Sequence, residues 1–220
     1  MSYAALQSLA HKRHLTILGG LHPDPETLSD LLPANTQTLL MLGPHEPAFW
    51  PQFTAQPEYT DGHPDPLDRW SKRIVDALAV ELRATAFYPS DGPPFPPFFS
   101  WAMQTGHCFQ SPIQLLVHDS AGMFVSFRGV LALPQHIDLP SPKQSPCLTC
   151  VDTPCVTTCP VNAFATGTYD VPTCKAYITA DPTQACMTSG CIARRSCPVS
   201  QTHPRIAAQS AFHMKAFLAP

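Results

Sequence analysis

The chain is poor in charge, and especially in positive charge. Lysine and arginine together number 13 among 220 residues, and apart from the adjacent Arg194 and Arg195 they are scattered. A protein that binds nucleic acid needs a basic field that neutralises several phosphates. Because the net charge is −3, we expect no nucleic-acid partner.

Long apolar runs are also missing. No stretch approaches the roughly 18 to 20 apolar residues that a transmembrane helix needs, so we expect no membrane span. The N-terminal segment lacks the uninterrupted apolar core of a secretion signal. We therefore expect a cytoplasmic protein, and structural disulfides are rare in that reducing compartment.

Cysteine is absent before Cys108, and this absence divides the chain. The other eight of the nine cysteines lie between Cys147 and Cys197, after a connector that is rich in proline. Twenty-six prolines favour short elements and many loops. We place a boundary near residue 134, with an α/β domain over residues 1–134 and a cysteine-rich module over residues 135–220.

Local patterns predict several elements of the first part. The short apolar runs 15–21 and 38–43 are typical of buried strands. Residues 65–84 predict an amphipathic helix, whose apolar face carries Leu67, Trp70, Ile74, Leu78 and Leu82. The segments 114–119 and 122–133 flank an Asp-Ser-Ala-Gly turn and predict a β-hairpin.

The cysteine spacings form two groups, and each group ends in Cys-Pro. The first is Cys147-x2-Cys150-x4-Cys155-x3-Cys159-Pro160, and the second is Cys174-x11-Cys186-x4-Cys191-x5-Cys197-Pro198. In two-cluster ferredoxins the cysteine before the proline ligates the other cluster. The spacing therefore predicts two [4Fe–4S] clusters: cluster one is held by Cys147, Cys150, Cys155 and Cys197, and cluster two by Cys159, Cys174, Cys186 and Cys191.

Zinc is the main alternative, and disulfides are a second. Structural zinc sites favour repeated C-x2-C pairs, often with histidine, whereas this region has one such pair and no histidine between Cys147 and Cys197. Four residues rather than two separate the second and third cysteines of the first group, and the second group is also widened. These insertions lengthen loops without removing a ligand, so the number of ligands is better fixed than their pairing.

Three stretches resemble a known family. CLTCVDTPCVTTCPVNAF (147–164), YDVPTCKAYI (169–178) and CMTSGCIARRSCP (186–198) resemble the iron–sulfur part of epoxyqueuosine reductases and corrinoid reductive dehalogenases. The strand–turn–strand pattern SPIQLLVHDSAGMFVSFRGVLAL (111–133) resembles the segment before their cysteines. The resemblance implies an α+β protein, with a nitroreductase-like α/β domain followed by a small ferredoxin-like dicluster module. It also implies a cobalamin in the first domain, reduced by the clusters.

Other residues are candidates for a site in or near that domain. The general-acid aspartate of the family falls near Asp91, which is otherwise interpreted as a turn residue before Gly92. His107 and His118 flank a strand beside the expected pocket and are candidates for corrinoid binding, or are ordinary hydrogen-bonded histidines. Cys108 stands outside both cysteine groups, and we expect a buried, inert thiol.

Two functions follow from these patterns. The first is an electron-transfer protein that passes single electrons through two [4Fe–4S] clusters to a redox partner protein or a bound cofactor. The alternative is an oxidoreductase, a corrinoid-dependent or cobalamin-reducing protein related to epoxyqueuosine reductase. Arg194 and Arg195 lie between cluster ligands, where positive charge raises a cluster's potential or docks an acidic partner. The substrate and the oligomeric state are left open.

Overall fold

The computed structural model describes residues 1–24 and 31–219 and has a mixed α+β fold. The chain forms two compact units, each made of two chain segments. Unit 1 comprises Met1–His107 and Ser126–Lys143, and unit 2 comprises Cys108–Val125 and Gln144–Pro220. Residues 108–125 therefore group with the cysteine-rich part, whereas the boundary near residue 134 had placed them in the first domain.

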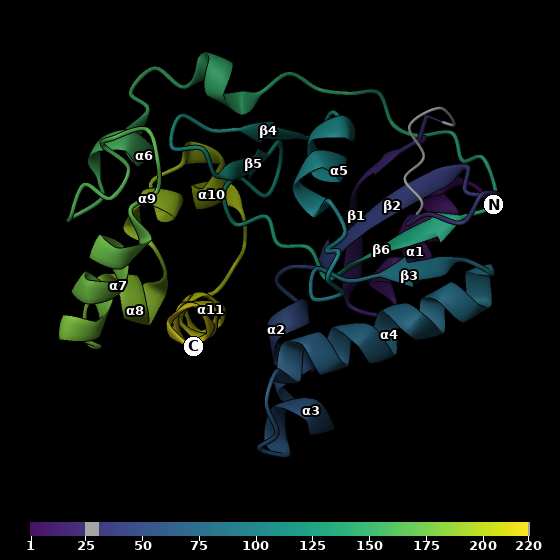
Figure 1. Cartoon of the computed structure of the whole chain (residues 1–220), viewed down its shortest axis with the longest axis horizontal. Helices are drawn as coiled ribbons and strands as arrows, with labels where there is room; N and C mark the ends of the chain where they lie inside the picture. The colour runs from purple at the N-terminus through teal and green to yellow at the C-terminus, as the bar shows by residue number, and fades with distance from the viewer. Residues whose placement is uncertain (25–30, 220) are drawn as a thin grey trace. The chain divides into compact units, whose positions relative to one another are not determined.

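Unit 1 is built on a four-stranded antiparallel sheet, in the order β1-β2-β6-β3 (Figure 1). Its strands are β1 (Leu15–Leu21), β2 (Thr38–Pro44), β3 (Thr85–Phe87) and β6 (Gly129–Leu133). The predicted strands over 15–21 and 38–43 are confirmed. Every residue of β2 and β6 is buried, because these central strands are covered on both faces.

A bulge in β1 shows how the sheet meets a helix. The register between β1 and β2 shifts between Ile17 and Gly19. Gly19 has a φ of 155°, and a Cβ atom there would lie 2.8 Å from Cβ of Thr105, the residue that ends helix α5. Glycine therefore lets the strand approach the end of this helix closely.

The described part of unit 1 contains five helices in addition to the sheet. They are α1 (Tyr3–His11), α2 (Phe49–Thr54), α3 (Pro57–Thr60), α4 (Pro66–Leu82) and α5 (Phe98–Gln104). Helix α4 packs on β6 and β3, while α1 and α5 pack on β1. The predicted amphipathic helix is confirmed as α4, although Val75 rather than Ile74 is fully buried on its inner face. Edge-to-face contacts of Trp70 with Phe49 and Phe53 join α4 to α2.

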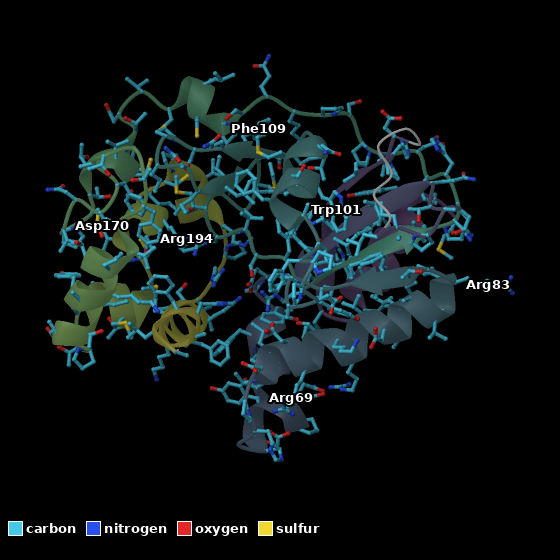
Figure 2. The ribbon with its side chains drawn as sticks, viewed as in Figure 1. Arg69, Arg83, Trp101, Phe109, Asp170 and Arg194 are labelled. Carbon is cyan, nitrogen blue, oxygen red and sulfur yellow. The ribbon has the colours of Figure 1, made fainter. Side chains whose placement is uncertain are left out.

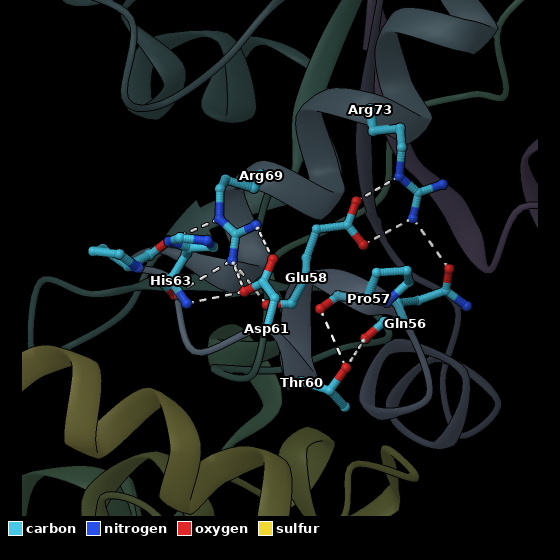
Figure 3. A network of polar contacts seen from close by, with 9 residues as sticks. Gln56, Pro57, Glu58, Thr60, Asp61, His63, Arg69 and Arg73 are labelled. Carbon is cyan, nitrogen blue, oxygen red and sulfur yellow. Dashed lines mark hydrogen bonds and ion pairs between the residues drawn. The ribbon is translucent and has the colours of Figure 1, made fainter.

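A polar network connects α3 to α4 on the surface of unit 1 (Figure 3). The Arg69 guanidinium donates two hydrogen bonds of 2.8 Å to the Asp61 carboxylate and one of 2.9 Å to the Glu58 carbonyl. Arg73 pairs with the Glu58 carboxylate, whose Oε2 accepts a bond of 3.0 Å. Because each guanidinium meets its carboxylate with two donors, the geometry of the network is fixed in both distance and orientation.

The predicted hairpin of 114–119 with 122–133 is wrong. Strand β5 (Leu116–His118) pairs instead with β4 (Cys108–Gln110) in unit 2, whereas β6 pairs with β2 and β3 in unit 1. The chain does reverse at the expected turn, where His118 and Gly122 exchange two backbone hydrogen bonds, but the ladder stops there. Strand β6 gains hydrogen-bonded neighbours on both edges in its buried position, which a two-stranded hairpin does not offer.

Unit 2 contains the β4–β5 ribbon and mostly short helices. They are η1 (Pro146–Thr149), α6 (Pro154–Thr157), α7 (Val171–Ala180), α8 (Ala185–Ser189), α9 (Ile192–Arg195), α10 (Pro198–Thr202) and α11 (Ala207–Leu218). Helix α11 packs against α8, as Figure 1 shows, and α9 packs against α6 and α10. Across residues 1–24 and 31–219, no helix combines the length and apolar character that a bilayer span requires.

The turn at 118–122 fits closely against α10. Gly122 has a φ of 57°, and a Cβ atom there would clash with the backbone nitrogen of Ser200. The Ser200 hydroxyl accepts a hydrogen bond of 2.8 Å from the Met123 amide. This contact fixes the β5 turn beside the helix that follows Cys197.

Candidate metal centre

The predicted ligands in unit 2 lie where short helices begin. Cys191 and Cys197 are the residues immediately before α9 and α10, while Cys147, Cys155 and Cys186 lie in the first turns of η1, α6 and α8. Proline occupies the first position of η1, α6 and α10, where its fixed φ favours a helix and its missing N–H is not needed. The Cys-Pro dipeptide at 197–198 therefore ends a loop with a cysteine and starts a helix with a proline.

Four of the cysteines line one cavity of unit 2, with a volume of about 430 Å³. They are Cys147, Cys150, Cys155 and Cys197, the set that the spacing predicts for cluster one. Three are consecutive in the first group, and the fourth comes from the end of the second group. Val117, Met123 and Val199 contribute to a largely apolar wall.

The cysteines that line this cavity change one another's pKa values. Burial, and then the thiolates of Cys147, Cys197 and Cys150, raise the pKa of Cys155 to about 11. Burial also raises the pKa of Cys147, with further contributions from Cys197 and Cys150. Four thiolates that interact in this way repel one another unless a cation lies between them, and the iron of a bound cluster would supply that positive charge.

The other four cysteines form a second set of electrostatic neighbours. Burial raises the pKa of Cys186, and the thiolates of Cys191, Cys174 and Cys159 raise it further. Burial also raises the pKa of Cys174, where Cys191 and Cys159 add to the shift and a hydrogen bond from Tyr169 opposes it. Within each set, the cysteines that act on one another electrostatically are thus the ones that the crossed arrangement assigns to a single cluster.

Hydrogen bonds to sulfur surround the second set. The Ala163 amide lies 3.4 Å from Sγ of Cys159, the Ile192 amide reaches Cys186, and the Tyr169 hydroxyl reaches Cys174. Such donors stabilise the thiolate over the thiol and are one of the means by which proteins set cluster potentials.

Tyr169 and Asp170, which the sequence patterns did not single out as site residues, position Cys174. Asp170 precedes α7 and accepts hydrogen bonds from the Thr173 amide and hydroxyl at 3.0 and 2.7 Å. Tyr169 stacks on Phe164, with 4.8 Å between the ring centroids. An Asp three residues before Thr, followed by a proline in the first turn, is a helix-start signal that could have indicated this capping.

A single metal ion requires its ligand atoms to lie closer together than a cluster of several metal ions does. No group of three or more His, Cys, Asp or Glu side chains within the described ranges is gathered tightly enough to hold one ion. A tetrahedral zinc ion with Zn–S bonds of 2.3 Å brings its sulfur atoms to within about 3.8 Å of one another. A four-iron cluster is larger than one ion and keeps its ligand sulfurs further apart, so four thiols around a cavity of about 430 Å³ fit it in number and chemistry.

Arg194, labelled in Figure 2, belongs to α9 and interacts electrostatically with Cys191 of the second set. Its Nε donates a hydrogen bond of 2.6 Å to the Met123 carbonyl. Burial lowers the pKa of the guanidinium, and the negative charges of Cys191 and Tyr169 oppose that change. A fixed cation therefore stands near Cys191.

The remaining candidates belong to neither cysteine set. Asp91 is exposed, and its Oδ2 accepts a hydrogen bond of 2.9 Å from the Tyr88 amide, as expected for a turn residue. His107 belongs to unit 1 and is half-buried, whereas His118 belongs to unit 2 and is buried. The Nδ1 atom of His118 accepts from the Ser120 and Ala121 amides at 3.1 and 3.2 Å, so this nitrogen is engaged within its own turn.

Cys108 is buried, as predicted. Burial, with a smaller contribution from Asp119, raises the pKa of its thiol to about 12. The thiolate is therefore scarce at neutral pH, which agrees with an inert side chain.

Comparison of the chain with protein-family models, with curated proteins and with solved structures finds no match.

Proposed function

We propose that this protein carries two [4Fe–4S] clusters and transfers single electrons to a partner protein. One observation carries the proposal: thiols from two distant stretches of chain, Cys147–Cys155 and Cys197, line a common cavity. A ferredoxin-like module requires this crossed arrangement, because a compact run of cysteines reaches three corners of a cluster and the fourth ligand comes from elsewhere. A bound cluster supplies reversible one-electron chemistry, and the protein supplies the ligands and their environment.

The surface around the first set is suited to contact with a redox partner. Leu148, Val151 and Val156 are exposed by 76%, 93% and 42%, and all three lie between or beside the cysteines of the first group. Exposed aliphatic side chains gathered on one segment are typical of an interaction surface. We infer that electrons pass between the partner and cluster one, while the second set, with its hydrogen bonds and Arg194, holds the inner cluster.

The resemblance to epoxyqueuosine reductases suggests a second function, a corrinoid-dependent reductase with a nitroreductase-like first unit. Phe95 and Phe99 are exposed by 65% and 50% on the segment that also holds the buried Trp101. Exposed aromatic faces can carry a flat cofactor ring. In this alternative, Asp91 or His107 of the same unit would be close to the cofactor.

Iron and acid-labile sulfide, measured after anaerobic reconstitution, test the main proposal. Two [4Fe–4S] clusters give about eight of each per chain. Cys150→Ala should remove one cluster, whereas Cys108→Ala should leave the content unchanged, because Cys108 lies outside both sets. Iron that is unaffected by Cys150→Ala, or equally reduced by Cys108→Ala, would contradict the assignment.

The EPR spectrum of cob(II)alamin, recorded with and without the reconstituted protein, separates the two functions. An electron carrier leaves the spectrum unchanged at protein excess. A corrinoid-binding reductase displaces the lower ligand of the cobalt and changes the hyperfine pattern.

A further inference from the structure

Two short helices of unit 2 each connect one cysteine set to the other. Helix α6 contains Cys155 of the first set and is followed, after one residue, by Cys159 of the second set. Helix α9 follows Cys191 of the second set and is itself followed, after one residue, by Cys197 of the first set. The two helices pack against each other (Figure 1), so the two connections meet.

The cysteines at the ends of these helices share one apolar core. Cys155 and Cys197 of the first set and Cys159 of the second are buried in the same group of residues, and Cys191 packs against it. Ala193 of α9 belongs to this group and is completely buried. Because members of both sets adjoin a single core, clusters bound by the two sets would be neighbours.

The residue between helix and cysteine carries a hydroxyl group in both connections. Thr158 ends α6 and directly precedes Cys159, while Ser196 ends α9 and directly precedes Cys197. The side-chain oxygens of Thr158 and Ser196 are 3.0 Å apart, within hydrogen-bonding distance. The two chain segments are therefore joined next to one ligand of each set.

Each hydroxyl also contacts its own helix, which fixes its position. The Ser196 hydroxyl donates to the Ala193 carbonyl at 2.8 Å, so it accepts the hydrogen bond from Thr158. The Thr158 hydroxyl lies 2.9 Å from the Pro154 carbonyl as well, and its one proton is shared between the two acceptors. Both side chains are half-buried, and a partly buried hydrogen bond is stronger than an exposed one.

We propose that the hydrogen bond between Thr158 and Ser196 fixes the separation of the two clusters. The inference rests on the proposed function, because it requires both clusters to be bound. Thr158 and Ser196 are positioning residues: they bind no metal themselves but hold Cys159 and Cys197, as groups behind the ligands do in other metal sites. Electron transfer between clusters slows steeply with distance, so this contact also sets how readily an electron passes from one set to the other.

EPR of the fully reduced, iron-replete full chain tests the proposal, because the magnetic interaction between two reduced clusters weakens steeply with their separation. Thr158→Val exchanges the donor hydroxyl for a methyl group, and Ser196→Ala removes the acceptor. We expect each variant to keep about eight iron and eight sulfide per chain and to lose part of the splitting that the interaction produces. Thr158→Ser keeps a hydroxyl at this position and should restore the splitting of the unaltered chain.

Thr157→Val is the matched control. Thr157 is the neighbouring residue of α6, is exposed and forms no side-chain hydrogen bond within the described part of the chain, so its replacement should leave the splitting unchanged. The double variant of Thr158→Val with Ser196→Ala should lose no more of the splitting than either single variant, since all three remove the same bond.

The outcomes separate this inference from the proposed function. Unchanged splitting in Thr158→Val and Ser196→Ala at full iron content, or an equal loss in Thr157→Val, would overturn the inference and leave the two clusters in place. Loss of iron from both variants would overturn it in favour of a role in holding the ligands. An unaltered chain without two interacting clusters would overturn the proposed function and the inference together.

Discussion

Paired cysteine replacements distinguish the two ways in which eight thiols could share two clusters. In the crossed arrangement Cys197 belongs with the first group, whereas pairing in sequence order would leave it with Cys174, Cys186 and Cys191. Two double variants separate these cases: Cys155→Ala with Cys197→Ala, and Cys186→Ala with Cys197→Ala. The three side chains are similarly buried, at 4%, 6% and 7% exposure for Cys155, Cys186 and Cys197, so the packing lost is comparable.

The expected iron content follows from the membership of each set. Cys155 and Cys197 line the same cavity, so their joint replacement destroys one site and leaves the other four thiols complete. About four iron and four sulfide per chain should remain, half of the content of the intact protein. Replacing Cys186 and Cys197 removes one ligand from each set, and no complete four-thiol site survives.

Anaerobic iron and sulfide analysis, combined with EPR of the dithionite-reduced samples, measures this difference. The Cys155/Cys197 variant should give the signal of one isolated reduced cluster, without the broadening that two interacting clusters produce. The reverse outcome, a complete cluster in the Cys186/Cys197 variant and none in the other, would refute the crossed arrangement. Unchanged metal content in both variants would refute cysteine ligation itself.

Further predictions concern stability and potential. Leu78→Ala should destabilise unit 1 by about 3 kcal/mol because it opens a cavity under a side chain that is 1% exposed, whereas Val80→Ala on the solvent face of α4 should change stability by less than about 0.5 kcal/mol. All three tryptophans are in unit 1, so their fluorescence in urea titrations reports the stability of both variants. Hydrogen bonds from Arg69 lower the pKa of Asp61 to about 2, below its usual 3.8. The ionised Asp61 carboxylate therefore contributes fully to the stability of the fold above about pH 4, and this contribution is lost as the pH falls towards 2. Asp61→Asn should remove this part of the acid dependence of the urea midpoint. Arg194→Gln should lower the midpoint potential of cluster two in an EPR-monitored redox titration, since it removes a cation beside Cys191, and Arg194→Lys should restore most of the difference.

Local patterns predicted some elements because those elements depend on local physics. The strands β1 and β2 are continuous apolar runs, and α4 has a clear helical period, so each could be recognised without its partners. The pairing of β6 could not, because the choice between β5 and β2 is decided by burial far along the chain. Residue spacing also could not show a cavity of unit 2 that is lined by four separate stretches of chain, namely Phe124, Ser189, Arg195 and residues 200–210.

The cysteines differ from these elements in their place in the fold, and this difference also separates the two units. Unit 1 has a core of aromatic and aliphatic side chains, whereas the core of unit 2 contains the thiols themselves: Cys155, Cys159 and Cys197 are buried in one group of apolar residues and Cys186 in another. A core built from thiols leaves few large apolar side chains to hold it, so under the proposed cysteine ligation metal binding and folding should be linked in unit 2. An iron chelator should then unfold unit 2, seen as a loss of helical circular dichroism, while the tryptophan fluorescence of unit 1 is retained. Loss of both signals at one chelator concentration would show that unit 1 also depends on the clusters, and its own core would then be insufficient.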